Sequence, residues 1–217
     1  YTLERTFGAH HYDRLNVVVR TAHGSWITDM RGRKYLDCLA AYSAANLGHH
    51  HPKVVNALMR ALVGNYASVI SNVIYTDPLA MFLSKAAEIV PQLGPRFGMN
   101  GNKVMPKNGG VESVETAIKM ARYYGFKEKS IPDGKQEIIV FNNNFHGRMT
   151  TVISFSTQQK YRGGFGPLTP GFVSVEFGNL DAVKAAINEN TCGILVEPLQ
   201  GEGGMRIPPG RIFLKNF

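Results

Sequence analysis

The chain has 217 residues, 44% hydrophobic and 18% charged, which is ordinary for a globular protein with a core. No apolar run could span a bilayer, and the net charge of +8 is scattered, so we expect neither a membrane protein nor a nucleic-acid binder. A basic surface that attracts small anionic ligands is favoured. No signal peptide is visible, and Cys38 and Cys192 lie in apolar sequence. This pattern predicts reduced, buried thiols in a cytosolic protein.

The first fifty residues predict a small antiparallel sheet. Strands are expected at 16–20, 25–29 and 34–39, separated by turns that contain glycine. Residues 7–12 have little periodicity and predict a loop. Three successive histidines at 49–51 could suggest a metal site, but ligand pairs on a helix are spaced i, i+4. We therefore favour a loop that enters a helix at Pro52.

Residues from 52 onward predict an α/β domain. A helix with an apolar stripe runs from Pro52 to Gly64, and a second begins at Asp77 and ends before Pro91. Short apolar strands are expected at 137–141, 151–155, 172–176 and 191–196, with a helix at about 180–188. Strands that alternate with helices imply a largely parallel sheet. Ligands of such sheets bind at the C-terminal ends of the strands.

A glycine turn before a helix is a candidate anion site. Residues 103–105 could end a strand, Asn108-Gly109-Gly110 turns the chain, and apolar residues recur at helical spacing from Val111. Gly125 stands where a C-terminal cap is expected. Such a helix start offers bare N–H groups and a positive dipole end to a phosphate. A Gly-Gly turn of this kind is nevertheless structural more often than it is anion-binding.

Two further loops, residues 142–148 and 197–204, follow predicted strands. They contribute an aromatic ring, an arginine and two carboxylates: Phe145, Arg148, Glu197 and Glu202. With the glycine turn, this set suits a phosphorylated, ring-bearing cofactor and a carboxylate substrate. Each member also has a structural interpretation, as core, solvated charge or turn residue. The dinucleotide fingerprint and the Walker A motif are both absent from the sequence, which argues against those nucleotide sites.

In their order these motifs resemble those of class III aminotransferases, which are fold-type I enzymes dependent on pyridoxal 5′-phosphate (PLP). The resemblance runs from about Phe7 to Gly210 and includes a motif at residues 164–167; the family continuation is not recognisable in residues 211–217. It implies the N-terminal part of that fold: residues 1–51 as an N-terminal segment, and 52–217 as an incomplete large PLP-binding domain. Within the class, residues 7–12 and Tyr42 are most similar to the ornithine aminotransferase branch.

The resemblance also implies roles for individual residues. Gly110 and Val111 would donate backbone N–H groups to the cofactor phosphate, Asn108 and Gly109 would shape the cup, and Phe145 would stack on the pyridine ring. The substrate side has a separate set. Arg148 and Tyr12 would hold a substrate carboxylate, Tyr42 would line the pocket, Glu202 would pair with an arginine from the later half of the fold, and Glu197 would support the site.

The implied reaction transfers the δ-amino group of ornithine to 2-oxoglutarate and yields glutamate-5-semialdehyde and glutamate. Acetylornithine or 4-aminobutyrate transamination and a catalytically inactive binding module are the alternatives. The family's Schiff-base lysine and pyridine-pairing aspartate lie beyond the segment that corresponds to Gly210. We therefore expect a truncated enzyme that is inactive alone and a homodimer when complete. The cytoplasm is the expected compartment, or the mitochondrial matrix in a eukaryote.

Overall fold

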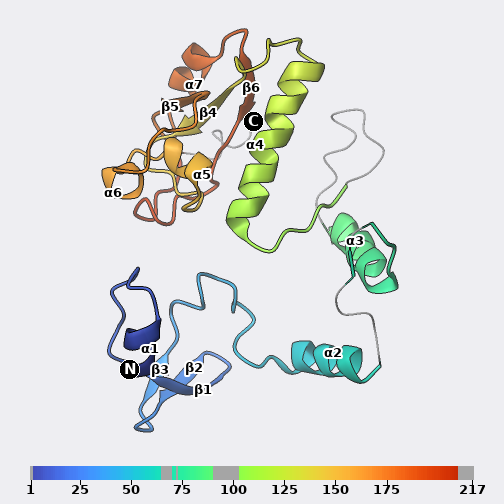
Figure 1. The fold of residues 1–217 in the computed structure, drawn as a ribbon, viewed down its shortest axis with the longest axis vertical. Coiled ribbons are helices and arrows are strands. Elements are labelled where there is room, and N and C mark those ends of the chain that lie inside the picture. Colours follow the sequence, from blue (N-terminus) through green and yellow to red (C-terminus); the bar gives the residue numbers. More distant parts are fainter. Residues whose placement is uncertain (1, 65–69, 72, 90–102, 210–217) are drawn as a thin grey trace. The chain divides into compact units, whose positions relative to one another are not determined.

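The computed structural model describes residues 2–64, 70–71, 73–89 and 103–209. The chain divides into two units, Tyr1–Lys103 and Val104–Phe217, and each is considered by itself (Figure 1). The division into functional domains at residues 51 and 52 stays a prediction. None of the helices in the described ranges is both long and apolar enough to cross a membrane.

Unit 1 contains the predicted antiparallel sheet. A short helix, α1 (Thr2–Phe7), precedes three strands in the order β1-β2-β3. The strands are β1 (Val19–His23), β2 (Trp26–Asp29) and β3 (Lys34–Leu36). Both pairs are antiparallel, and Trp26 pairs with His23 on one side and Leu36 on the other. The sheet is confirmed, although β1 begins three residues later than expected and runs up to the turn around Gly24.

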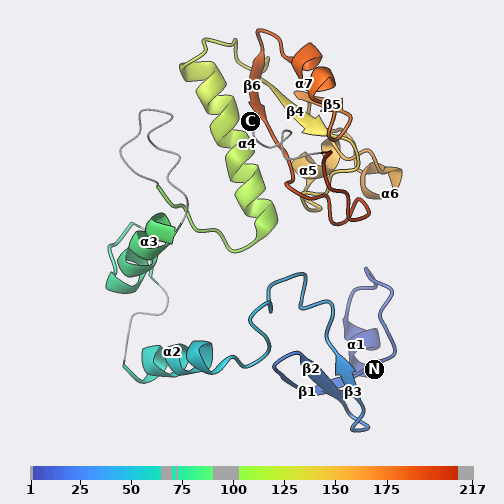
Figure 2. The ribbon, with the colours of Figure 1, turned by 180° about the vertical axis from the view of Figure 1, so that it is seen from behind.

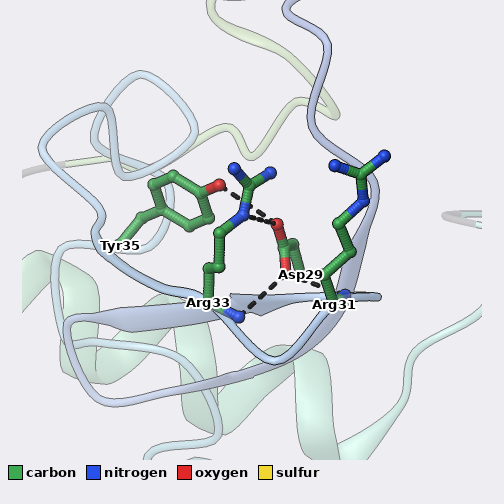
Figure 3. Close-up of polar contacts among 4 residues, drawn as sticks. All are labelled: Asp29, Arg31, Arg33 and Tyr35. Carbon is green, nitrogen blue, oxygen red and sulfur yellow. Dashed lines mark hydrogen bonds and ion pairs between the residues drawn. The ribbon is translucent and has the colours of Figure 1, made fainter.

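The turn between β2 and β3 is organised by the carboxylate of Asp29 (Figure 3). One oxygen accepts the backbone N–H groups of Arg31 and Arg33, both at 2.9 Å. The other accepts Arg33 Nε at 2.8 Å and the Tyr35 hydroxyl at 3.1 Å. Burial by itself would raise the pKa of Asp29, but these bonds outweigh burial and lower the pKa to about 2. The carboxylate thus fixes the turn while it is ionised.

Two predicted helices follow the sheet: α2 (Pro52–Val63) and α3 (Asp77–Ile89). Both are confirmed, with a proline in the first turn of α2 and an aspartate in the first turn of α3. The preceding histidines have separate partners: His49 Nε2 lies 2.7 Å from Asp37, and His50 Nδ1 lies 2.9 Å from the carbonyl of Ala22. In the described ranges no group of three or more potential ligands could hold a metal ion.

Unit 2 is built on a parallel sheet, as the sequence predicts. Its strands are β4 (Glu137–Phe141), β5 (Phe172–Val175) and β6 (Thr191–Ile194), in the order β5-β4-β6. Both pairings are parallel. The predicted helix before β6 is α7 (Leu180–Ala186), which begins after an Asn179 cap. The sheet and this helix are confirmed.

Helices cover both faces of the sheet (Figures 1 and 2). Side chains of β4 alternate between two apolar clusters, because successive residues of a strand point to opposite faces. Ile138 and Val140 pack with the long helix α4 (Gly110–Lys127) and with α5 (Thr150–Ser154). Ile139 and Phe141 pack with Val183 of α7 on the other face. Burial on both faces explains why β4 is an unbroken apolar run.

The strand predicted at 151–155 is wrong, because residues 151–154 belong to the helix α5 and Phe155 is its C-cap. The Ser154 hydroxyl donates to the carbonyl of Thr150 at 2.7 Å, one helical turn back. Val152 and Phe155 are buried against the α4 side of the sheet. Tertiary packing overrides the β propensity of this short apolar run. A four-residue helix, α6 (Gln159–Arg162), follows it.

Three smaller expectations also fail. No strand includes residues 103–105; the strands described in this unit are β4, β5 and β6. Gly125 lies inside α4 and not at its cap, because α4 passes so close to β6 that a Cβ at Gly125 would fall 2.6 Å from Cys192 Cβ. Cys192 is half-buried, as a strand residue facing α4 should be, but Cys38 is exposed; both thiols are free.

Candidate cofactor-binding site

The predicted phosphate cup is the N-terminus of α4. Asn108, Gly109 and Gly110 are exposed and Val111 is half-buried. The first N–H groups of a helix have no intrahelical acceptor, and they lie at the positive end of its dipole. The Gly109 N–H is already used, since it donates to Glu112 Oε2 at 2.8 Å. The free donors for an anion are therefore those of the first turn.

The glycines leave room at this helix start. No other atom lies within 4 Å of the position that a Cβ would take on Gly110, and the nearest to that position on Gly109 is Glu112 Oε2 at 3.8 Å. An anion could approach the backbone closely here. The Glu112 carboxylate at the edge opposes a second negative charge, so the cup suits a phosphate held mainly from the Gly110 side.

The loop after β4 is fixed at successive residues. The Asn143 N–H donates to Thr157 Oγ1 at 2.9 Å. The buried Asn144 amide donates to the carbonyls of Phe141 at 2.6 Å and Phe155 at 3.1 Å. The Phe145 N–H donates to Glu197 Oε1 at 3.3 Å. A loop tied in this way can hold a side chain in one place, as a binding site requires.

Gly147 brings this loop against the cup. Its φ is +119°, and a Cβ there would lie 2.4 Å from Cγ2 of Val111. The loop after β4 therefore packs directly on the first turn of α4. Two of the three predicted loops meet, even though the first of them does not follow a strand. Arg148, the next residue, is exposed.

The third loop joins through Phe145 and Glu202. Phe145 is half-buried and not part of either apolar cluster, which disfavours its interpretation as a core residue. Its ring meets the ring of Tyr161 edge-on, with centroids 5.6 Å apart. The Tyr161 hydroxyl donates to Glu202 Oε1 at 3.0 Å. Tyr161, on α6, was not singled out by the sequence, where it stands in a polar stretch with no motif of its own.

Glu197 and Gln200 form a polar contact that includes the backbone N–H of Phe145. Glu197 is half-buried, and burial raises the pKa of its carboxyl, although the Phe145 N–H and the Gln200 amide act in the opposite direction. The Gln200 amide donates to Glu197 Oε2 at 3.1 Å and to the Asn142 carbonyl at 2.9 Å. Gln200 lies in the predicted loop 197–204, but nothing in the sequence predicts a role for it.

His146 is a second residue that sequence reasoning missed. Its ring lies against that of Phe155, with centroids 5.7 Å apart. Its Nε2 is shielded from solvent and has no hydrogen-bond partner among the described residues. Burial lowers the pKa of this imidazole to about 4, so His146 is neutral near pH 7.

The substrate-side tyrosines lie in unit 1. Tyr12 is half-exposed and lines a pocket of about 580 Å³ formed by residues 4–19. Tyr42 is exposed and lies in a turn where Ala40, Ala41, Tyr42 and Ser43 all have positive φ, from 47° to 72°. Such a left-handed run of non-glycine residues is strained. A meeting of Tyr12 and Tyr42 with Arg148 stays a prediction.

A parallel sheet with an open helix N-terminus, a half-buried aromatic ring and polar loops after its strands is typical of α/β domains that bind a cofactor. The family model described as aminotransferase class-III matches residues 7–216, so the chain belongs to the class III aminotransferases. These are PLP-dependent enzymes of fold type I. The match continues to residue 216, so the expectation that the resemblance ends at Gly210 is wrong.

Ornithine aminotransferases are among the proteins of this class that are similar to the chain. That of Staphylococcus carnosus is 45% identical over 203 residues, which are 94% of this chain and 48% of the relative. Ornithine aminotransferase 2 of Staphylococcus aureus is 44% identical over 207 residues, 95% of this chain and 50% of the relative. The chain thus spans about half the length of the curated relatives it matches.

Solved structures agree with this assignment. The ornithine aminotransferase of Toxoplasma gondii has a TM-score of 0.89 at 31% identity, with 99% of this chain and 48% of that chain covered. The acetylornithine aminotransferase of Elizabethkingia anophelis has a TM-score of 0.77 at 32% identity, with 99% and 47% covered. The fold-type I architecture is confirmed.

Proposed function

We propose that this chain is the part of an ornithine aminotransferase that binds the phosphate of the cofactor. The complete enzyme transfers the δ-amino group of ornithine to 2-oxoglutarate. The observation that carries the proposal is the 44–45% identity to ornithine aminotransferases along 94–95% of the chain. The acetylornithine aminotransferase of Elizabethkingia anophelis is 32% identical to the chain, below the 44–45% of these ornithine aminotransferases, so the alternative has less support. The products are glutamate-5-semialdehyde and glutamate.

The residues present fit PLP. The first turn of α4 has open space at Gly110 and N–H donors for the phosphate, with Asn108, Gly109 and Val111 shaping the cup. Phe145 is held by its backbone with its ring outside the core, and it would stack on the cofactor ring. When bound, PLP supplies the electron sink for amino transfer.

The substrate residues act by charge and orientation. Arg148 is exposed beside the cup and would bind a substrate carboxylate by a charge-assisted fork, with Tyr12 donating to the same carboxylate and Tyr42 lining the pocket. Glu202 would pair with an arginine from the later half of the fold. Tyr161 supports that role, because its hydroxyl already holds the Glu202 carboxylate.

Binding of pyridoxamine 5′-phosphate tests the cofactor site. This form lacks the aldehyde and cannot react with surface lysines, and its fluorescence reports binding. Phe145→Ala should weaken binding roughly tenfold, the loss expected for one aromatic contact. Phe126→Ala is the matched control, because Phe126 is an exposed phenylalanine near the C-terminal end of α4, at the opposite end of that helix from the cup. Equal affinity of the two variants would refute the cofactor assignment of Phe145.

Amine selectivity tests the substrate. The protein isolated from its natural source should transfer the amino group of ornithine to 2-oxoglutarate faster than that of acetylornithine or 4-aminobutyrate. A faster rate with either competitor would replace the ornithine assignment. We also propose a homodimer in the cytoplasm, or in the mitochondrial matrix of a eukaryote. Sedimentation of the native protein measures the oligomeric state, and fractionation of the source cells before isolation identifies the compartment.

A further inference from the structure

Gln200 is a fully buried amide in the loop after β6, with a relative exposure of 0%. Its backbone is closed by a pair of bonds with Arg206: the Gln200 N–H donates at 3.0 Å, and its carbonyl accepts at 2.9 Å. This bridge fixes the backbone from which the buried side chain of Gln200 extends. The amide then reaches a residue 58 positions earlier, the Asn142 carbonyl that begins the loop after β4.

The orientation of this amide is dictated by its neighbours. The Asn142 carbonyl and the Glu197 carboxylate are both acceptors, so the NH₂ group of Gln200 must face them. Glu197 uses its other oxygen to accept the Phe145 N–H. A continuous chain of bonds therefore leads from Gln200 through Glu197 to the backbone of Phe145.

Packing alone does not explain a buried amide at this position. Burial of an amide is unfavourable unless its polar atoms are satisfied, and Gln200 Oε1 has no partner among the described residues. A leucine would fill a similar volume without an unsatisfied oxygen. The retained amide has an effect that a leucine could not have, because it fixes the two acceptors on which the loop after β4 depends.

We propose that Gln200 and Glu197 are positioning residues that set the place of the Phe145 ring, and hence the stacking of the cofactor. We name this pair the Gln200–Glu197 clasp. It deepens the proposed function, since it acts on the same cofactor site. The clasp touches the backbone of the loop and not the cofactor phosphate, which is left to α4. Its loss should therefore loosen Phe145 without unfolding the sheet.

Gln200→Leu tests the clasp, with Gln136→Leu as the matched control. Gln136 is also buried, and its amide donates to the carbonyls of Ile131 and Pro132 before β4 begins, at the other end of the strand. The first readout is hydrogen exchange of the Phe145 amide in the chain without cofactor. Gln200→Leu should speed this exchange roughly tenfold, the effect of losing one bond to a charged group, and Gln136→Leu should not.

The second readout is the affinity for pyridoxamine 5′-phosphate, which should fall roughly tenfold in Gln200→Leu alone. Equal exchange and equal affinity in the two variants would overturn the clasp. If Gln200→Leu does not fold, Glu197→Gln decides, because it keeps an oxygen for Phe145 but sets an amide against the Gln200 amide. Its Phe145 amide should also exchange faster, and unchanged exchange would reject the proposal. If the unmutated chain does not bind pyridoxamine 5′-phosphate, the proposed cofactor site is rejected. The hydrogen-exchange rates of the Phe145 amide in the two variants still test whether the Gln200–Glu197 clasp holds the loop.

Discussion

Replacement of Gly147 by alanine should test the packing of the loop after β4 against the phosphate cup. The substitution should lower the stability of unit 2 in two ways. The backbone has φ +119°, a conformation that alanine avoids at a cost of about 1–3 kcal/mol. The new Cβ would also lie 2.4 Å from Cγ2 of Val111, and overpacking of this kind costs about 1–3 kcal/mol more. We therefore expect a total loss of about 2–6 kcal/mol.

Gly134→Ala is the control for this variant. Gly134 has φ +77°, but no atom lies within 4 Å of the position that its Cβ would take, so its substitution measures backbone strain alone. Urea titration should be followed by exchange of the β4 amides, because the single tryptophan, Trp26, reports on unit 1. Addition of Val111→Gly to Gly147→Ala should restore part of the packing loss, since it removes both Val111 carbons that clash, Cγ2 at 2.4 Å and Cβ at 2.6 Å. Equal destabilisation by the two glycine variants would refute the contact.

Three further outcomes are expected. Burial lowers the pKa of His146 from 6.5 to about 4. The free energy of unfolding of unit 2 should therefore be constant above pH 6.5 and fall by up to about 3 kcal/mol between pH 6.5 and pH 4, because in that range only the unfolded state takes up the proton. His146→Phe should remove this dependence in β4 amide exchange, and an unchanged pH profile would contradict the cause. The pKa of Asp29 is lowered from 3.8 to about 2, so its carboxylate stabilises unit 1 above pH 3.8 and loses this effect as the pH falls toward 2. Asp29→Asn should flatten the dependence of unit 1 stability on pH, measured by Trp26 fluorescence. A dependence as steep as before would exclude this carboxylate as its cause. Ala41→Gly, at φ 47°, should raise the stability of unit 1 by about 1 kcal/mol in the same fluorescence assay, and a loss would show that the turn is unstrained.

The sequence predicts most of the fold of unit 2, for a physical reason. β4 and β6 are near-continuous apolar runs because helices lie on both sides of the sheet, and this signature is visible without a structure. The same signature misleads at α5, which is buried on the α4 side and is only five residues long. A short apolar run has no period long enough to separate a helix from a strand. Its packing partner, α4, decides the outcome.

Close approaches of the backbone are harder to predict. Gly125 and Gly147 both look like turn or cap residues in the sequence. In the structure each is the point where one element passes too close to another for a Cβ, against Cys192 and Val111 respectively. The need for glycine arises from residues far away in the chain, which no local pattern contains.

Some residues of the candidate site can likewise be predicted from the sequence, and others cannot. The glycine turn, Phe145 and Arg148 can be proposed from residue types alone, because phosphate, ring and carboxylate recognition each demand particular chemistry. Gln200 cannot be proposed in that way, since an isolated glutamine has no preferred function. Its role follows from two acceptors, one of which lies 58 residues earlier in the sequence.

Those two acceptors also explain why a glutamine is suited to the position. A serine or threonine has a single O–H donor and could satisfy either the Asn142 carbonyl or Glu197, but not both. A lysine has enough donors but would bring a charge that must be desolvated in a fully buried place. An asparagine has the same amide on a side chain one methylene shorter. The glutamine amide is neutral, carries two N–H groups and reaches both acceptors, so the loops after β4 and β6 are held together next to the backbone of Phe145.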